Sequence, residues 1–159
     1  FDEDLLPDVL GKLLLKKNAT LAVAESCTGG HIAQLITSIP GSSMYFIGGV
    51  VAYSNAVKMQ LLGVKSETLE QHGAVSEEVV IQMAEGIRRN LKSDYGIATT
   101  GVAGPGGGSD EKPVGTVWIA VSGPEGTTAK RFQFGDIRER NVLRAGMTAL
   151  NILRKFINA

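Results

Sequence analysis

A short polar segment, Glu25–Gly30, joins an apolar strand to a helix and constrains the fold more than any other part of the chain. Residues 20–23 have the composition of a buried strand, and residues 31–36 carry apolar side chains at helical spacing. Strands of α/β sheets that end in small polar residues and glycine build sites at their carboxyl ends. Because a helix N-terminus favours negative charge, we expect this corner to hold a nucleophile, a phosphate or a developing oxyanion.

Hydrophobic periodicity predicts helices that alternate with strands along the chain. Helices are expected over residues 3–17, 29–38, 55–62, 64–72, 76–91 and 138–157. Strands are expected over residues 20–25, 45–53, 95–100, 115–122 and 127–134. Gly48 and Gly49 indicate a bulge or a close backbone approach in the second strand. This order predicts an α/β fold with a mixed sheet covered on both faces, in a single domain over residues 1–159.

Charge and composition exclude several classes of protein. Lys+Arg and Asp+Glu both number 16, whereas nucleic-acid and membrane binders normally carry a basic excess. Apolar stretches are far shorter than a spanning helix, and the start shows no signal-peptide pattern, so we expect a cytoplasmic protein. One cysteine, Cys27, excludes an internal disulfide framework, and with only two histidines it argues against a structural zinc site.

Ser26 is the first candidate nucleophile, and a serine hydroxyl needs a neighbouring base. His31 and His72 stand in contexts typical of capping or exposed histidines, and no Gly-x-Ser-x-Gly elbow is present. Lys58, just beyond the second strand, is the remaining candidate base, because burial favours a neutral amine. A solvated helix lysine is the alternative. Cys27 fits a small buried residue better than a thiol nucleophile.

A second unusual stretch, Thr99–Asp110, follows another predicted strand. Its glycines let the backbone approach a ligand, although a flexible connection is equally consistent with them. Ser42 and Ser43 have hydroxyls that suit an anion or a turn, and Arg138, Arg140 and Arg144 cluster where the last helix begins. The residues alone thus predict a Ser/Thr/Gly-lined pocket for an anionic small molecule and identify no substrate.

Five motifs together resemble the CinA C-terminal domain family over about residues 4–157. They are Ala24–Gly30, Gly41–Ser43, Tyr53–Asn55 with Lys58, His72–Ser76 and Thr100–Gly107. The resemblance implies a three-layer α/β/α sandwich. It also implies nicotinamide-nucleotide amidohydrolase activity, in which nicotinamide mononucleotide and water give nicotinate mononucleotide and ammonia. Longer members of the family carry an N-terminal pyrophosphatase-like domain, whose activity is not carried over to this chain.

The resemblance also implies a mechanism. Ser26 attacks the carboxamide carbon, Lys58 is the base, and Tyr53 orients Lys58 or relays the proton; Ser43 is the competing nucleophile. Backbone N–H groups near Gly29, Gly30 or Gly101 hold the tetrahedral oxyanion. The implied substrate-binding residues are Thr28, Gly29, Gly30, Ser42, Ser43, Thr100, Gly101, Gly104, Arg138 and Arg140. No metal or other cofactor is required.

The sequence leaves open which arginine binds phosphate and which of three functions the chain has. Family members often read Gly-Asp-Arg after the last strand, whereas this chain reads Gly-Asp-Ile-Arg over residues 135–138, so either Arg138 or Arg140 is the expected phosphate ligand. A non-catalytic nucleotide-binding regulatory module and a hydrolase of another small amide are the alternative functions. A homodimer is expected because small α/β enzymes commonly pair.

Overall fold

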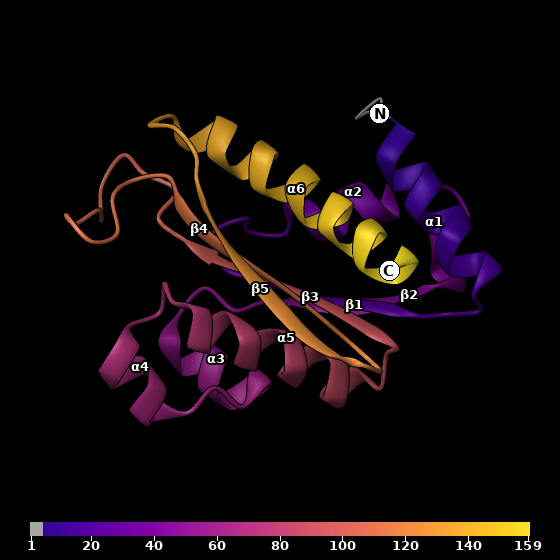
Figure 1. Cartoon of the computed structure of the whole chain (residues 1–159), viewed down its shortest axis with the longest axis horizontal. Helices are drawn as coiled ribbons and strands as arrows, with labels where there is room; N and C mark the ends of the chain where they lie inside the picture. Colours follow the sequence, from indigo (N-terminus) through magenta and orange to yellow (C-terminus); the bar gives the residue numbers. More distant parts are fainter. Residues whose placement is uncertain (1–4) are drawn as a thin grey trace.

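The computed structural model describes residues 5–159 and shows a five-stranded sheet between two layers of helices (Figure 1). The strands are β1 (Leu21–Glu25), β2 (Phe46–Val51), β3 (Tyr95–Gly101), β4 (Thr116–Gly123) and β5 (Gly126–Gln133). The helices are α1 (Leu6–Lys16), α2 (His31–Thr37), α3 (Asn55–Leu62), α4 (Ser66–His72), α5 (Glu77–Leu91) and α6 (Arg138–Asn158), with a 3₁₀ turn, η2 (Ser42–Met44). The three-layer α/β/α architecture with a mixed sheet is confirmed.

The strand order is β2-β1-β3-β4-β5, with β1 parallel to both β2 and β3, and with β4 and β5 antiparallel to their neighbours. Glu25 lies opposite Val51 on one side and Thr99 on the other. The segments that follow these three parallel strands therefore meet at one end of the sheet, as in other open α/β folds.

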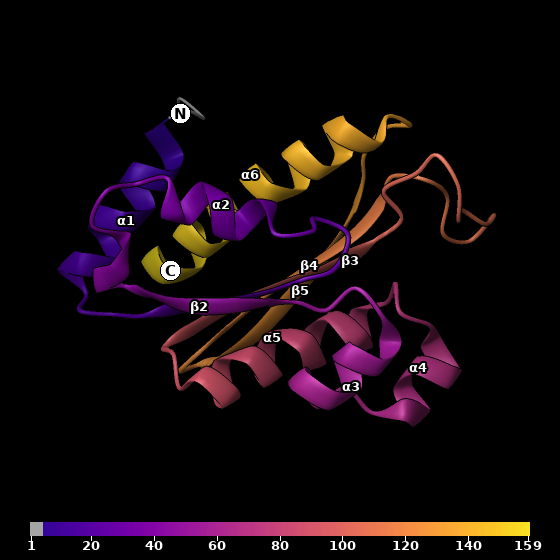
Figure 2. The ribbon, with the colours of Figure 1, turned by 180° about the vertical axis from the view of Figure 1, so that it is seen from behind.

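Each face of the sheet has its own apolar layer. Helices α1, α2 and α6 cover one face, and α3, α4 and α5 cover the other, which Figure 2 shows from behind. Leu10, Ile32 and Leu150 belong to the first buried cluster. Leu62 and Met83 belong to the second. Apolar periodicity along each helix and strand is thus satisfied by burial on both sides of the sheet.

Glycines explain where two predicted elements change shape. The helix expected over residues 29–38 begins at His31, because Gly29 and Gly30 have φ angles of +58° and +102°. The predicted irregularity of the second strand is confirmed, since the pairing of β1 with β2 shifts between Leu21 and Ala22. A Cβ on Gly49 would lie 2.6 Å from the Val23 side chain.

The other predicted elements are confirmed with small shifts at their ends. The first helix begins at Leu6, with Pro7 in its first turn, and the expected positions 3 and 4 lie outside the described residues. Ser54 and Ser76 cap α3 and α5 by accepting backbone N–H groups of Val57 and Val79. No helix within residues 5–159 is long and apolar enough to cross a membrane.

Candidate active site

Ser26 and Lys58 meet at the carboxyl end of β1. The backbone N–H of Ser26 donates to the carbonyl of Thr99 at 3.1 Å, which fixes the turn beside β3. Lys58 extends from the first turns of α3, and its Nζ lies 3.1 Å from the Ser26 Oγ. Both side chains are buried. A hydroxyl and an amine are therefore in hydrogen-bond contact, out of bulk water.

Two backbone carbonyls hold the Lys58 amine in place. Its Nζ donates to the carbonyls of Ala52 at 2.9 Å and of Tyr53 at 3.1 Å, both in the segment that leaves β2. Lys58 is only 1% exposed, and burial lowers its pKa below the ordinary value of 10.5. When the amine is neutral, the two carbonyls take its two N–H groups and its lone pair is left for the Ser26 hydroxyl. The solvated-lysine alternative is wrong.

Cys27 is buried beside this pair. Burial raises the pKa of its thiol from 9.0 to about 12, since a thiolate would lose its hydration there. A thiol in this state is a poor nucleophile at neutral pH. The prediction of a small buried residue at this position is confirmed.

The protein's own carboxylate fills the anion position at the start of α2. Oε1 of Glu25 accepts the N–H of Ile32 at 2.8 Å, and Oε2 accepts the N–H of Ala33 at 3.0 Å. A carboxylate favours this place because it meets free backbone donors and the positive end of the helix. The N–H groups of Ile32 and Ala33 are therefore taken by Glu25, and another anion at this corner would have to meet other backbone donors.

Some backbone N–H groups in the turn after Ser26 already donate to protein carbonyls, and others are free to bind a substrate oxygen. The N–H of Gly29 donates to the Ser26 carbonyl at 3.1 Å, so it is already used. Within residues 5–159, the N–H groups of Thr28 and Gly30 have no protein acceptor. The Thr28 hydroxyl is 2.8 Å from the hydroxyl of Thr99. Thr28 and Gly30 thus present free donors at the turn, whereas Gly29 does not.

The glycine-rich segment over residues 102–115 is tied down by side chains from α6. Arg138 donates to the Gly104 carbonyl at 2.7 Å and to the phenol oxygen of Tyr53 at 3.0 Å. The buried amide of Asn141 donates to the carbonyls of Ala103 and Gly135. The neighbouring carbonyls of Ala103 and Gly104 are therefore both held by α6. Arg138 also joins the segment to Tyr53, whose carbonyl accepts a hydrogen bond from Lys58.

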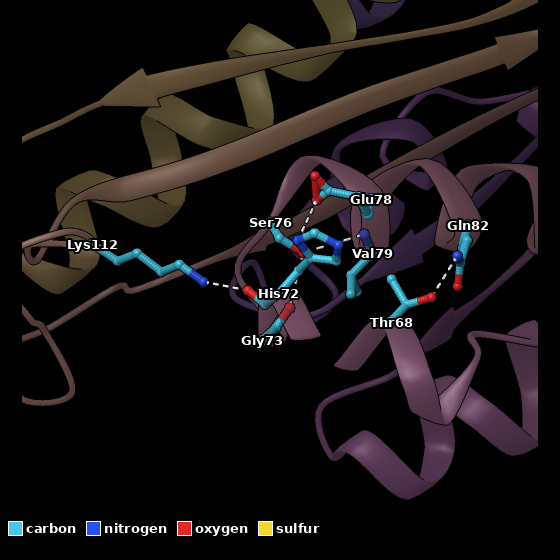
Figure 3. Close-up of polar contacts among 8 residues, drawn as sticks. All are labelled: Thr68, His72, Gly73, Ser76, Glu78, Val79, Gln82 and Lys112. Atoms are coloured by element: carbon cyan, nitrogen blue, oxygen red, sulfur yellow. Dashed lines mark hydrogen bonds and ion pairs between the residues drawn. The ribbon is translucent and has the colours of Figure 1, made fainter. Parts of the chain in front are cut away.

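The far side of the same segment is tied to the connection between α4 and α5. Nζ of Lys112 donates to the His72 carbonyl, and Nδ1 of His72 lies 3.4 Å from a carboxylate oxygen of Glu78 (Figure 3). The hydroxyl of Thr100 donates to the carbonyl of Ala74 at 2.8 Å. The sequence left open whether this glycine-rich segment is a flexible connection or a ligand-binding one. These contacts hold it in place.

Glycine at position 101 is required by packing. A Cβ on Gly101 would lie 2.6 Å from the Thr116 carbonyl, because β3 and β4 approach closely where the segment begins. Gly101 is the last residue of β3, and Thr99 of the same strand lies opposite Glu25, so Gly101 lies at the end of the sheet that holds Ser26.

Ser42 and Ser43 are not near this site within the chain. They form η2, which leads into β2, and the carbonyl of Tyr45 accepts the N–H of Leu21 at the start of β1. Ser26 follows the other end of β1. The parallel pairing of β1 and β2 thus separates these serines from Ser26 by the length of a strand.

Within residues 5–159, Arg140 makes no hydrogen bond or ion pair with the residues around Ser26. It lines a cavity of about 330 Å³ at the start of α6, together with Asp136, Ile137 and Arg144. Positions two apart on a helix point in nearly opposite directions, which is why Arg138 and Arg140 diverge. Of the two expected phosphate ligands, the structure brings only Arg138 to Tyr53 and Gly104.

Glu25 and Asn141 are site residues that sequence reasoning missed. An acidic residue just before a glycine turn and a helix could have indicated the capping role of Glu25. An asparagine in the first turn of a helix that follows a glycine could have indicated the role of Asn141. Neither pattern identifies the groups that these side chains bind. Residues 5–159 contain no group of three or more His, Cys, Asp or Glu side chains arranged for a metal ion.

The sequence of this chain matches a known protein family over nearly its whole length. The model of the CinA C-terminal domain matches residues 3–157. A CinA-like protein of Parasynechococcus marenigrum is 54% identical over 155 residues, covering 96% of this chain and 37% of the relative. One from Desulforapulum autotrophicum is 54% identical over 147 residues, covering 92% of this chain and 35% of the relative. The chain thus spans little more than a third of these relatives.

Solved structures give the same result. The competence/damage inducible protein CihA from Agrobacterium tumefaciens superimposes with a TM-score of 0.96 at 38% identity, covering 100% of this chain and 97% of that one. A CinA superfamily protein from Klebsiella pneumoniae gives a TM-score of 0.95 at 34% identity, covering 99% of both chains. With the family model matching nearly every residue and the fold shared throughout, this chain belongs to the CinA family, through its C-terminal domain.

Proposed function

We propose that this chain is a serine amidohydrolase that converts nicotinamide mononucleotide and water to nicotinate mononucleotide and ammonia. The observation that carries the proposal is the 3.1 Å contact between the buried Lys58 Nζ and the Ser26 Oγ. The resemblance of the surrounding motifs to the CinA family supplies the substrate. A small-molecule substrate, no nucleic acid, no cofactor, a cytoplasmic location and a homodimer belong to the same proposal.

The proposed reaction begins at the Ser26 hydroxyl. Neutral Lys58 takes its proton while Oγ forms a bond to the carboxamide carbon, and the carbonyl oxygen becomes an oxyanion. The free N–H groups of Thr28 and Gly30 are the candidates to stabilise that oxyanion; one such donor is worth roughly 3–4 kcal/mol in known acyl transfers. Lys58 returns the proton to the amide nitrogen, the C–N bond breaks and ammonia leaves.

Water completes the proposed cycle. Lys58 accepts a proton from a water molecule, whose oxygen attacks the acyl carbon of the ester on Ser26. The C–O bond to Oγ breaks, Ser26 regains its proton, and the acid product is released. Every step uses one nucleophile and one base, which matches the hydroxyl and amine that the fold brings together.

Arg138 is the better candidate for the substrate phosphate. Its guanidinium lies beside Tyr53 and Gly104, on the side of the site where Lys58 is held. Arginine binds phosphate through paired N–H donors, and a carbonyl and a phenol are ligands that phosphate can replace. Ser26 is preferred over Ser43 as the nucleophile, because Ser43 has no base in contact with it within residues 5–159.

A regulatory nucleotide-binding module is the second candidate function. It is less favoured because binding alone does not require a buried lysine against a serine hydroxyl, which costs free energy of folding through the desolvated amine. A hydrolase of another small amide would keep the dyad and differ in the residues that bind the rest of the substrate.

Ammonia release separates these functions. The chain is incubated with nicotinamide mononucleotide, nicotinamide riboside or free nicotinamide, in the presence of a chelator, with Ser26→Ala as the control. We expect release from the mononucleotide alone and its loss in Ser26→Ala. Equal release from free nicotinamide would exclude the phosphate anchor, and no release by folded protein would favour the binding module.

A further inference from the structure

A second cavity lies in the helical layer that α1, α2 and α6 form on one face of the sheet. These three helices lie together in Figure 2, and residues from each of them line a cavity of about 690 Å³. Small-molecule sites in proteins commonly have volumes of this order. None of Ser26, Lys58 and Arg138 lines it, so this cavity is distinct from the candidate active site.

Close packing of α2 on α6 fixes one wall of the cavity. A Cβ on Gly146 of α6 would lie 2.6 Å from Cδ2 of His31 and 3.2 Å from Cδ1 of Leu35. Both side chains of α2 therefore rest on α6 where it has no side chain of its own. Both also line the cavity, so this wall is held by packing before any ligand binds.

Apolar side chains make up much of the lining. They come from α1, α2, the end of β5 and α6, and they are Leu6, Leu35, Phe134, Leu143 and Met147. Leu143 is 48% exposed, so its side chain stays largely in contact with water in the free protein. A ligand with an apolar body gains free energy by removing such surface from water.

The polar part of the lining carries positive charge without a counter-charge. Arg144 and the ring of His31 have no hydrogen bond or ion pair in the part of the chain that the structure describes, and no lining residue there is acidic. Asp136 lines the adjoining cavity with Arg144 but forms no ion pair with it. Oδ1 of Asn151 accepts from Arg154 at 2.9 Å, which leaves the amide N–H groups of Asn151 as donors. The lining thus suits an anionic group.

We propose that this cavity binds a small monoanion with an apolar body, an alkyl or aryl acid, with its anionic group on Arg144 and its apolar body against Leu35 and Met147. Carboxylate, sulfonate and phosphate groups all accept paired N–H donors from arginine. One negative charge and an apolar body therefore define the ligand class, whereas the kind of acid does not. The site is independent of the proposed amidohydrolase activity, because no residue of the Ser26–Lys58 pair takes part.

The fluorescence of anilinonaphthalene sulfonate, an anion with apolar rings, tests the role of Arg144. Dissociation constants are compared for the wild-type chain, Arg144→Gln and Arg138→Gln at low ionic strength, where exposed charges are little screened. Both variants lose one charge from α6, but only Arg144 lines the cavity. We expect Arg144→Gln to bind the probe about fivefold more weakly, the upper range for an exposed ion pair, and Arg138→Gln to bind it like the wild-type chain. Unchanged affinity in Arg144→Gln, or an equal loss in both variants, overturns the proposal.

Displacement of the same probe tests the two parts of the ligand separately. Octanoate has both a charge and an apolar chain, octanol lacks the charge, and acetate lacks the chain. We expect octanoate to displace the probe at a several-fold lower concentration than octanol, and acetate not to displace it. Equal displacement by octanol would show an apolar cavity without preference for an anion, and displacement by acetate would show that the apolar body is not recognised; either result rejects the proposed class.

Proton NMR locates the site without any measurement of activity. The chain has two histidines, His31 in the cavity wall and His72 on α4, which covers the other face of the sheet (Figure 1). Each imidazole gives its own C–H signal, and a His72→Gln variant assigns the two. We expect octanoate to move the signal of His31 and to leave that of His72 in place. A His31 signal that does not move, or that moves no more than the signal of His72, places the ligand elsewhere and overturns the proposal.

Discussion

The ε-amino nitrogen of Lys58 lies 3.1 Å from the hydroxyl oxygen of Ser26, and both groups are withdrawn from water. The carbonyls of Ala52 and Tyr53 hold that amine without neutralising it, since neither carries a charge. Burial therefore acts unopposed by a carboxylate partner and favours the neutral amine, the form that can accept a proton. The ability to act as a base comes from the position of Lys58 in the fold rather than from lysine chemistry in water.

Removal of the amine should stop turnover while leaving the fold intact. Lys58→Met keeps an unbranched side chain of similar length, and we expect kcat to fall roughly 10²–10⁴-fold, the usual contribution of a positioned general base. The exposed Lys65 on the next connection provides the matched control Lys65→Met, which should retain wild-type turnover. Ammonia release from nicotinamide mononucleotide measures both. Wild-type turnover in Lys58→Met would exclude lysine as the base.

The same burial predicts how stability depends on pH. The folded-state pKa of Lys58 is below its unfolded value of 10.5, so between these values the unfolded chain binds more protons than the folded one. The stability of the wild-type chain should therefore rise with pH through this window. Below the folded pKa, the destabilisation by the buried ammonium is complete.

Lys58→Met tests this pH dependence because it removes the titrating group. Its free energy of unfolding relative to the wild-type chain should be most favourable at low pH and should decline as pH approaches 10.5. Urea unfolding at a series of pH values measures the difference, with Lys65→Met as the control that should show none. A difference for Lys58→Met that does not vary with pH would contradict a lowered pKa.

Local patterns predicted the elements and the candidate dyad well, because each depends on residues close in sequence. Apolar spacing set the strands and helices, and Ser54 and Ser76 marked caps that the structure confirms. The Ser26 turn and Lys58 could be placed after two different strands that end in polar residues. What brings them into contact is the parallel pairing of β1 with β2. The family resemblance implied that Lys58 serves Ser26 as a base, and spacing alone predicted no strand pairing.

The misplaced residues depend on long-range pairing. Ser42 and Ser43 were expected in the Ser26 pocket, but a parallel strand begins at the end of the sheet opposite to the site. Glu25 lies within the Ala24–Gly30 motif, which gave it no predicted role of its own, and its carboxylate is committed to the N–H groups of α2. No local signal distinguishes a carboxylate that caps its own helix from one that faces a substrate, because both lie beside the same free donors.

Arginine substitutions should separate the two candidate phosphate ligands. Arg138→Ala removes a charge-assisted donor worth about 1.5–3 kcal/mol, so we expect KM for nicotinamide mononucleotide to rise roughly 10- to 150-fold. Arg140→Ala, which changes a side chain without contact to Tyr53 or Gly104, should leave KM unchanged. Steady-state kinetics with the mononucleotide and the riboside measures both effects. Equal KM values for the wild-type chain and Arg138→Ala would remove Arg138 from the substrate site.

A packing change far from the substrate should also reach the dyad. A Cβ on Gly86 of α5 would overlap the backbone carbonyl of Leu62, one turn after Lys58 on α3, so Gly86→Ala must push the two helices apart. We expect a loss of about 1–3 kcal/mol of stability, typical of overpacking, and a lower kcat as Lys58 moves away from Ser26. Gly106→Ala is the control, because a Cβ there meets nothing within 4 Å. Urea unfolding and ammonia release measure the two effects, and a Gly86→Ala chain with the wild-type midpoint and turnover would show that α3 tolerates the displacement without moving its lysine.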